Sequence, residues 1–212
     1  MKCLLCESAV TEFLLDITFK PFGKKTLRRC AVCDLVFVDT QFRLTQLEEK
    51  ARYDQHINDP ADGEYIRFLN RLVEPLKVKL GKNAVGLDYG CGPGPAIQTL
   101  MGQSGLVVSH YDPYYFPDKS VLARQYDFVT LTEVAEHFYN PREEFLRINA
   151  LLKAEKSFCA VMTQMTDTVE NFQDWWYVRD PTHVCFYSQK TCDWMGDCGW
   201  IFIHDMAQDV TV

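Results

Sequence analysis

The sequence predicts an α/β protein in which helices cover both faces of a mostly parallel sheet, preceded by a small cysteine-rich β module. From residue 64 onward, strand-like and helix-like segments alternate, and the strands are almost continuously apolar, as in sheets buried on both faces. Residues 1–40 instead carry two Cys-x2-Cys pairs and are too few to bury a core of their own. We therefore predict a module over 1–40, a linker over 41–63 and a main domain over 64–212.

The elements of the main domain follow from hydrophobic spacing. Apolar residues three or four apart predict a helix over 64–80, which Pro75 should kink or divide. Another helix should begin with Asn140 as its N-cap and Pro141 in its first turn. Further helices are predicted over 96–101 and 188–197, and strands over 84–89, 106–111, 126–131, 157–163 and 200–204.

Composition excludes several classes of protein. The 212 residues are 47% hydrophobic and 24% charged, as in an ordinary globular protein, and the formal net charge is −7. An acidic chain is a poor generic partner for nucleic acids or anionic membranes. No uncharged apolar run reaches about 18 residues, and the N-terminus lacks the apolar stretch of an export signal. We expect a cytoplasmic protein with no membrane partner.

Four of the nine cysteines have the spacing of a metal site. Cys3 and Cys6 form one pair, and Cys30 and Cys33 form the other, 23 residues later. Four thiolates complete a closed tetrahedral shell around Zn²⁺, which predicts a structural zinc site in a zinc-ribbon-like module. Two unrelated cysteine pairs, or redox-active dithiols, are the alternatives. The remaining five cysteines are expected to be reduced and mostly buried.

A glycine-rich turn follows the first strand of the main domain. Residues 88–94 read D-x-G-x-G-x-G, and position 95 is proline, so a dinucleotide pyrophosphate loop does not fit. No G-K-[ST] follows, which excludes a P-loop. Asp88 suits a ligand amine, and Asp112, ending the next strand, suits a ribose diol. Together they favour an adenosine cofactor that carries an amino acid.

This segment resembles motif I of the class I S-adenosylmethionine-dependent methyltransferases, and the likeness extends over roughly residues 60–205. The resemblance implies a Rossmann-like methyltransferase fold and S-adenosylmethionine as cofactor. Only 14 residues separate Asp112 from Asp127. The family usually has a helix and a third strand there, and this strand should be missing or rudimentary. The residues expected to bind the cofactor are Asp88, Gly90, Cys91, Gly92, Gly94, Asp112 and Glu133.

A second metal site is suggested by Glu133, Glu136 and His137. On a helix, positions i, i+3 and i+4 share one face, so the three side chains should converge and could hold a divalent ion. The segment resembles ubiquinone-pathway O-methyltransferases, some of which bind such an ion. The alternative is a helix cap with salt bridges to arginines such as Arg142.

Two histidines are candidates for proton transfer. Methyl transfer to a hydroxyl requires removal of its proton, and histidine titrates near neutral pH. His137 follows the fourth-strand segment, and His183 lies in a turn where substrate-facing loops are expected. Either could instead make only structural hydrogen bonds.

We therefore expect an enzyme that methylates a small molecule, on a hydroxyl oxygen. Two alternatives remain open: a ribosomal-RNA or other macromolecule methyltransferase, and a non-catalytic zinc-ribbon interaction protein that kept the cofactor fold. A homodimer could form through the ribbon or the C-terminal strand.

Overall fold

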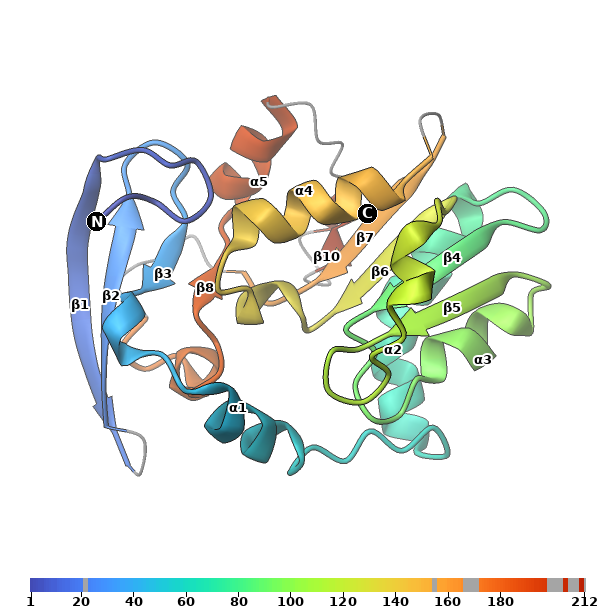
Figure 1. Cartoon of the computed structure of the whole chain (residues 1–212), viewed down its shortest axis with the longest axis horizontal. Helices are drawn as coiled ribbons and strands as arrows, with labels where there is room; N and C mark the ends of the chain where they lie inside the picture. The colour runs from blue at the N-terminus through green and yellow to red at the C-terminus, as the bar shows by residue number, and fades with distance from the viewer. Residues whose placement is uncertain (21–22, 154–155, 166–171, 198–203, 206–209, 212) are drawn as a thin grey trace. The chain divides into compact units, whose positions relative to one another are not determined.

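The computed structural model describes residues 1–20, 23–153, 156–165, 172–197, 204–205 and 210–211. The chain forms two compact units that interleave along the sequence (Figure 1). The first contains residues 1–52, 135–144 and 163–202, and the second contains residues 53–134, 145–162 and 203–212. These units do not follow the predicted sequential boundaries at residues 40 and 63. The predicted linker contains a helix, α1 (Gln46–Tyr53).

The second unit is built on a six-stranded sheet in the order β5-β4-β6-β7-β10-β9. The first four of these strands are mutually parallel, whereas β10 is antiparallel to both β7 and β9. This confirms the mostly parallel sheet expected from the apolar strands. The strands are β4 (Val85–Tyr89), β5 (Val107–Tyr111), β6 (Phe128–Thr132), β7 (Phe158–Met162), β9 (His204–Asp205) and β10 (Val210–Thr211).

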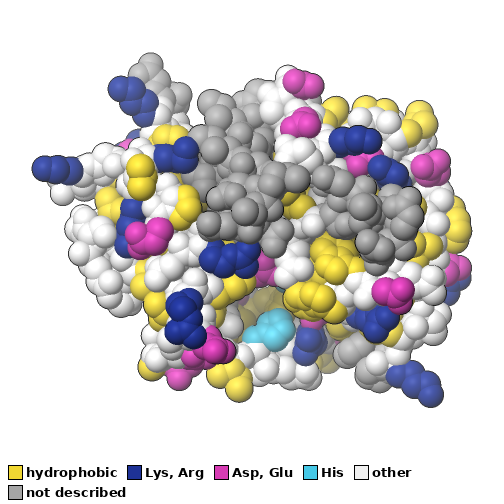
Figure 2. Space-filling view, turned by 180° about the vertical axis from the view of Figure 1, so that it is seen from behind, with side chains coloured by type: hydrophobic (Ala, Val, Ile, Leu, Met, Phe, Trp, Pro, Cys, Tyr) yellow, Lys and Arg dark blue, Asp and Glu magenta, His cyan; other side chains and the backbone are white. Residues whose placement is uncertain are grey.

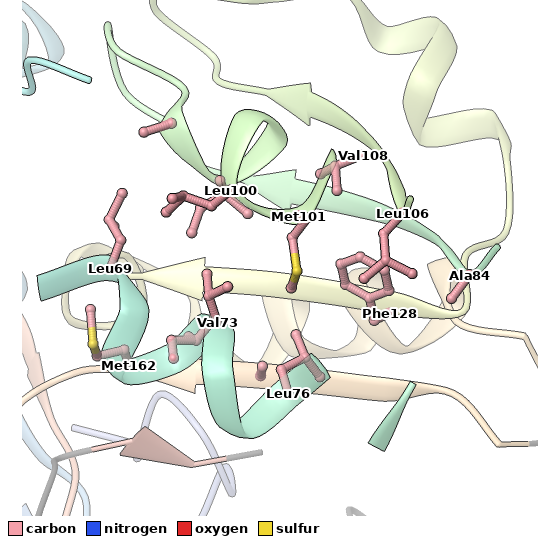
Figure 3. Close-up of a cluster of buried hydrophobic side chains, with 14 residues drawn as sticks. Leu69, Val73, Leu76, Ala84, Leu100, Met101, Leu106, Val108, Phe128 and Met162 are labelled. Carbon is pink, nitrogen blue, oxygen red and sulfur yellow. The ribbon is translucent and has the colours of Figure 1, made fainter. Parts of the chain in front are cut away.

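Helices α2 (Gly63–Lys79) and α3 (Ala96–Gly102) pack on one face of this sheet (Figure 3). Leu69, Val73 and Leu76 of α2 meet Phe128 of β6 and Met162 of β7 in one buried cluster. Strand residues pointing to the opposite face are buried too, among them Leu87, Val129, Leu131 and Val161. Burial of both faces explains why these strands are apolar at nearly every position.

The first unit contains the cysteine-rich module and a second, antiparallel sheet in the order β1-β2-β3-β8. Its strands are β1 (Thr11–Phe19), β2 (Gly23–Cys30), β3 (Val36–Val38) and β8 (Cys185–Phe186). The last strand comes from the C-terminal third of the chain, so the module does not fold around residues 1–40 alone. Helix α5 (Gln189–Asp197) belongs to this unit, and α4 (Pro141–Leu151) runs from the first unit into the second.

Two predictions about local structure have clear outcomes. Pro75 does not divide its helix, because α2 continues through it from Gly63 to Lys79. Between Asp112 and Asp127 the structure has a 3-10 helix, η2 (Lys119–Ala123), and no strand, which confirms that the element is missing from this fully described stretch. Most of the strand predicted over 200–204 lies outside the described residues.

None of the described helices is long and apolar enough to cross a bilayer. On the face seen in Figure 2, basic and acidic side chains are interspersed. Interspersed charges do not produce the field of one sign that attracts a polyanion.

Candidate cofactor site and metal centres

The glycine-rich turn lies at the carboxyl end of β4, between its neighbours β5 and β6. The chain passes from β4 to β5 on one side and later returns to β6 on the other, the arrangement at which open α/β sheets bind ligands. Gly90 and Gly92 have φ angles of 78° and 64°, a region that side chains disfavour. The backbone N–H groups of Gly90 and Cys91 both donate to the carbonyl oxygen of Tyr111, at 2.8 and 3.2 Å, so the turn is tied to β5.

Position 94 has no room for a side chain, because the backbone of another segment passes close to Gly94. A Cβ atom at this position would lie 1.9 Å from the backbone oxygen of Asn58. The segment before α2 therefore closes directly over the turn. Asn58 lies in the predicted linker. Its contact with Gly94 could not be predicted, because it leaves no periodic pattern in the sequence.

Asp112 connects the end of β5 to the same turn. Its Oδ2 accepts a hydrogen bond from the Gly92 N–H at 3.0 Å, and its Oδ1 accepts from the N–H groups of Tyr114 and Tyr115. An ionised carboxylate offers about four acceptor positions, so room remains for one further donor. The carboxylate is buried and oriented before any ligand binds.

Asp88 is buried in β4 with 3% of its surface exposed, and it accepts a 2.9 Å hydrogen bond from the Thr130 hydroxyl of β6. Burial raises the pKa of Asp88 to about 7, and the negative charge of Asp112 adds to the rise, while the Thr130 hydrogen bond opposes it. A carboxyl group in such a site gains a partner when a cationic ligand group binds beside it.

We expect Asp88→Asn to stabilise the ligand-free protein increasingly as the pH rises. Asp88 binds its proton more tightly in the folded state than in the unfolded chain, whose pKa is near 3.8. Its contribution to stability is therefore present at low pH and lost as the pH rises toward 7. Between pH 5.5 and 7.5 the difference in unfolding free energy, variant minus wild type, should grow by about 2 kcal/mol.

Denaturant unfolding at several pH values measures this difference. Asp174→Asn is the matched control, because the Asp174 side chain is 93% exposed and its difference should stay flat. A flat difference for Asp88→Asn as well would show that the pKa of Asp88 is not raised by folding.

Aromatic side chains lie beside the Asp112 turn in the same unit. The rings of Tyr53 and Tyr114 are 5.7 Å apart, and the Tyr115 hydroxyl donates to Asp54 at 2.7 Å. These contacts join the last residue of α1 and the residue after it to the chain that follows β5. Sequence reasoning missed these residues, because they lie in segments without hydrophobic periodicity.

The four paired cysteines converge in the first unit, as predicted. All four sulfur atoms lie within 4.8 Å of one another, with Sγ–Sγ distances of 3.5 Å for Cys3–Cys33 and 3.4 Å for Cys6–Cys30. Sulfurs placed tetrahedrally around Zn²⁺ at 2.3 Å would be separated by about 3.8 Å. The four thiols therefore fit a zinc ion with little movement.

The two cysteine pairs sit on matching turns. The N–H of Glu7 donates to the Cys3 carbonyl at 3.1 Å, and the N–H of Asp34 donates to the Cys30 carbonyl at 3.0 Å. Both Glu7 and Asp34 have left-handed φ angles, of 61° and 64°. Two equivalent knuckles facing each other are the arrangement of a tetrathiolate metal site.

A buried lysine of β2, which precedes the second cysteine pair, binds backbone carbonyls within the first unit. Lys25 is buried, and its ammonium group donates to the carbonyl oxygens of Val178, Asp180 and His183. Burial lowers the pKa of Lys25 to about 7, and the charge of Asp180 partly opposes this. Strand β2 thus holds the loop that carries His183.

The Glu133, Glu136 and His137 triplet does not lie on one helix face, so that prediction is wrong. Only Ala135–His137 is helical, as a single 3-10 turn (η3), and Glu133 precedes it with a left-handed φ of 53°. Strand β6 ends at Thr132, and the turn that follows is too short for i and i+4 positions to align. The structure instead brings His183 to Glu136 and His137.

Both predicted catalytic histidines are held by backbone carbonyls. Nδ1 of His137 lies 3.1 Å from the Thr182 oxygen, and Nδ1 of His183 lies 2.8 Å from the Tyr177 oxygen. A carbonyl only accepts, so the Nδ1 atom of each ring carries a proton. Burial, with His137 alongside, lowers the pKa of His183, which favours its neutral form.

The fold and the glycine turn define a class of protein: an α/β domain with a glycine-rich turn at the carboxyl edge of a mostly parallel sheet. Residues 53–200 match the family described as "Methyltransferase domain". The chain belongs to this family of methyltransferase domains, as the motif predicted.

The similar solved structures include two methyltransferases. CalO1, a methyltransferase in calicheamicin biosynthesis with S-adenosylhomocysteine bound, is 12% identical over 70% of this chain and 53% of that protein, with a TM-score of 0.46. The chain thus spans about half the length of CalO1. A possible histamine N-methyltransferase from Thermotoga maritima is 15% identical over 75% of this chain and 78% of that protein, with a TM-score of 0.42. A search of curated proteins found no match.

Proposed function

We propose that the protein transfers a methyl group from S-adenosylmethionine to a hydroxyl oxygen of a small molecule. The observation that supports this best is the glycine turn flanked by Asp88 and Asp112, with both carboxylates buried at the carboxyl ends of adjacent strands. When bound, S-adenosylmethionine supplies an electrophilic methyl group on a positively charged sulfur.

Each part of the turn has a proposed role toward the cofactor. Asp112, already oriented by three N–H groups, would accept a hydrogen bond from a ribose hydroxyl. Asp88 would offset the positive charge of the cofactor's amino group. Gly90, Cys91, Gly92 and Gly94 would form the close backbone approach, with Glu133 at the end of β6 as a further contact. Burial raises the pKa of the Cys91 thiol, which keeps it neutral.

A small-molecule acceptor is supported by the charge of the protein. The net charge of −7 disfavours a nucleic-acid acceptor, and the face seen in Figure 2 carries interspersed basic and acidic side chains. For a hydroxyl acceptor, His137 and His183 are the proposed proton acceptors. The tetrathiolate site is proposed to hold a structural zinc ion, since four thiolates leave no open coordination position.

Calorimetric titration with S-adenosylmethionine and S-adenosylhomocysteine tests the cofactor site. We expect wild-type protein to bind both, and Asp112→Ala to lose about 10- to 100-fold in affinity, because a charged hydrogen-bond acceptor is removed. Glu74→Ala is the control, because it removes an exposed carboxylate on α2 and should leave affinity unchanged. Failure of the wild-type protein to bind either ligand would reject the proposal.

A further inference from the structure

Arg43 is a half-buried arginine of the first unit that neither the proposed reaction nor the zinc site uses. It follows the 3-10 helix η1 (Thr40–Phe42) and lies in the irregular segment before α1. Its Nη1 atom donates to the backbone oxygen of Tyr139 at 2.8 Å. Its Nε and Nη2 atoms are buried, and none of the residues that the structure describes accepts a hydrogen bond from them. Arg43 therefore holds buried donors that still need an acceptor.

The Nε and Nη2 atoms form one edge of the planar guanidinium group. The N–H of Nε and one N–H of Nη2 point in the same direction along this edge. Two parallel donors at this spacing match the two oxygens of a carboxylate, which an arginine binds through a pair of charge-assisted hydrogen bonds. The edge of Arg43 that lacks an acceptor thus has the geometry of a carboxylate-binding group.

Tyr139 fixes the orientation of this edge. Cζ of Arg43 lies 4.8 Å from the centroid of the Tyr139 ring, so the guanidinium contacts both the ring and the backbone oxygen of one tyrosine. The Tyr139 hydroxyl donates to the backbone oxygen of Leu44, the next residue along the chain, at 3.0 Å. An arginine that is held before a ligand binds loses less side-chain freedom on binding.

The positive charge of Arg43 is poorly compensated. Burial lowers the pKa of Arg43, and nearby groups that include Asp39 oppose this only in part. Asp39 does not bond the guanidinium, because its Oδ1 atom accepts from the N–H of Gln41 in η1. A guanidinium stays protonated even when it is buried, and a buried charge is costly unless it is paired. An anion that reached this edge would remove that cost.

We propose that Arg43 binds the carboxylate group of a small molecule through Nε and Nη2. A carboxylate brings one negative charge and two acceptor oxygens, which is what this edge lacks. A phosphate group brings more charge and more oxygens than a single buried cation can match. Arg43 lies outside the helices and strands, so a local shift of residues 43–45 admits the ligand. This binding does not depend on the proposed methyl transfer.

Thermal melting of the full chain in sodium acetate tests the proposal, with sodium chloride of the same concentration as reference. If acetate dissociates at about 10 mM, then about 100 mM acetate should raise the melting temperature of the wild type by about 4 °C. Arg43→Lys keeps the charge but lacks the paired donors, and Arg43→Met removes both, so each variant should lose the rise. Arg179→Lys makes the same exchange at an exposed arginine of the first unit and should keep it.

Nuclear magnetic resonance of nitrogen-15 in the arginine side chains shows where the anion binds. The signal that disappears in Arg43→Lys is the Nε–H of Arg43, and acetate, unlike chloride, should shift it in the wild type. A wild type that does not respond to acetate, or a rise in melting temperature that both Arg43 variants keep, would overturn the proposal. A response to inorganic phosphate but not to acetate would overturn the assignment to a carboxylate. Calorimetry with S-adenosylmethionine on the same samples reports separately on the cofactor site.

Discussion

Cys30→Ser is expected to release the tetrathiolate zinc ion and to destabilise the first unit. Cys30 is fully buried, and its Sγ lies 3.4 Å from that of Cys6. Structural zinc contributes on the order of 10 kcal/mol to folding in small modules that cannot bury a sufficient core. A loss of only several kcal/mol would lower the melting temperature by about 10 °C or more.

Zinc content and thermal melting under reducing conditions measure this effect. Cys159→Ser is the matched control, since Cys159 lies in β7 of the second unit and the same exchange of sulfur for oxygen should leave zinc content unchanged. The zinc site would be refuted by wild-type protein that holds no metal at the four cysteines after reloading. Unchanged zinc content in Cys30→Ser would refute it equally.

The consequences of losing this zinc should extend beyond the N-terminal module. Strand β3 pairs with β8, and Lys25 of β2 holds the carbonyl oxygens of the loop that carries His183. Hydrogen exchange should therefore accelerate in residues 176–186 as well as in residues 1–40. Acceleration limited to residues 1–40 would show that the C-terminal segment folds independently of the module.

Gly94→Ala is expected to weaken S-adenosylmethionine binding by about 10- to 100-fold. The added Cβ would lie 1.9 Å from the backbone oxygen of Asn58, and backbone cannot move aside as a flexible side chain can. Either the turn or the segment before α2 must shift, at a typical cost of 1–3 kcal/mol for overpacking. The turn and the segment before α2 both border the proposed cofactor site. The affinity for S-adenosylmethionine and the stability of the protein should therefore both fall.

Calorimetric titration and thermal melting measure affinity and stability. A matched variant shows whether replacing any glycine by alanine has the same effect. Gly102→Ala is the matched control, because a Cβ at that helix end meets nothing within 4 Å. We expect this control to bind the cofactor as the wild type does. Normal affinity in Gly94→Ala would mean that the glycine turn is not where the cofactor binds.

Much of the second unit could be predicted, because its signals are local. Apolar strands alternating with amphipathic helices identified the parallel sheet, and the short stretch between Asp112 and Asp127 identified the missing strand. Pro75 does not divide its helix, in which the neighbouring Leu72, Val73 and Leu76 are buried. The prediction that Glu133, Glu136 and His137 share one helix face failed, because the helix it required is a single 3-10 turn.

By itself the sequence determined the features that depend on spacing along the chain: the two cysteine knuckles, the glycine turn, and the acidic residues that end two strands. Only the tertiary structure decided which distant residues meet them. The His137 ring is held by a carbonyl 45 positions away, and Lys25 reaches one 158 positions away. Such contacts form when packed elements bring polar groups together in the interior, and no local periodicity encodes them. For the same reason the cluster of Glu136, His137 and His183 emerged only from the fold.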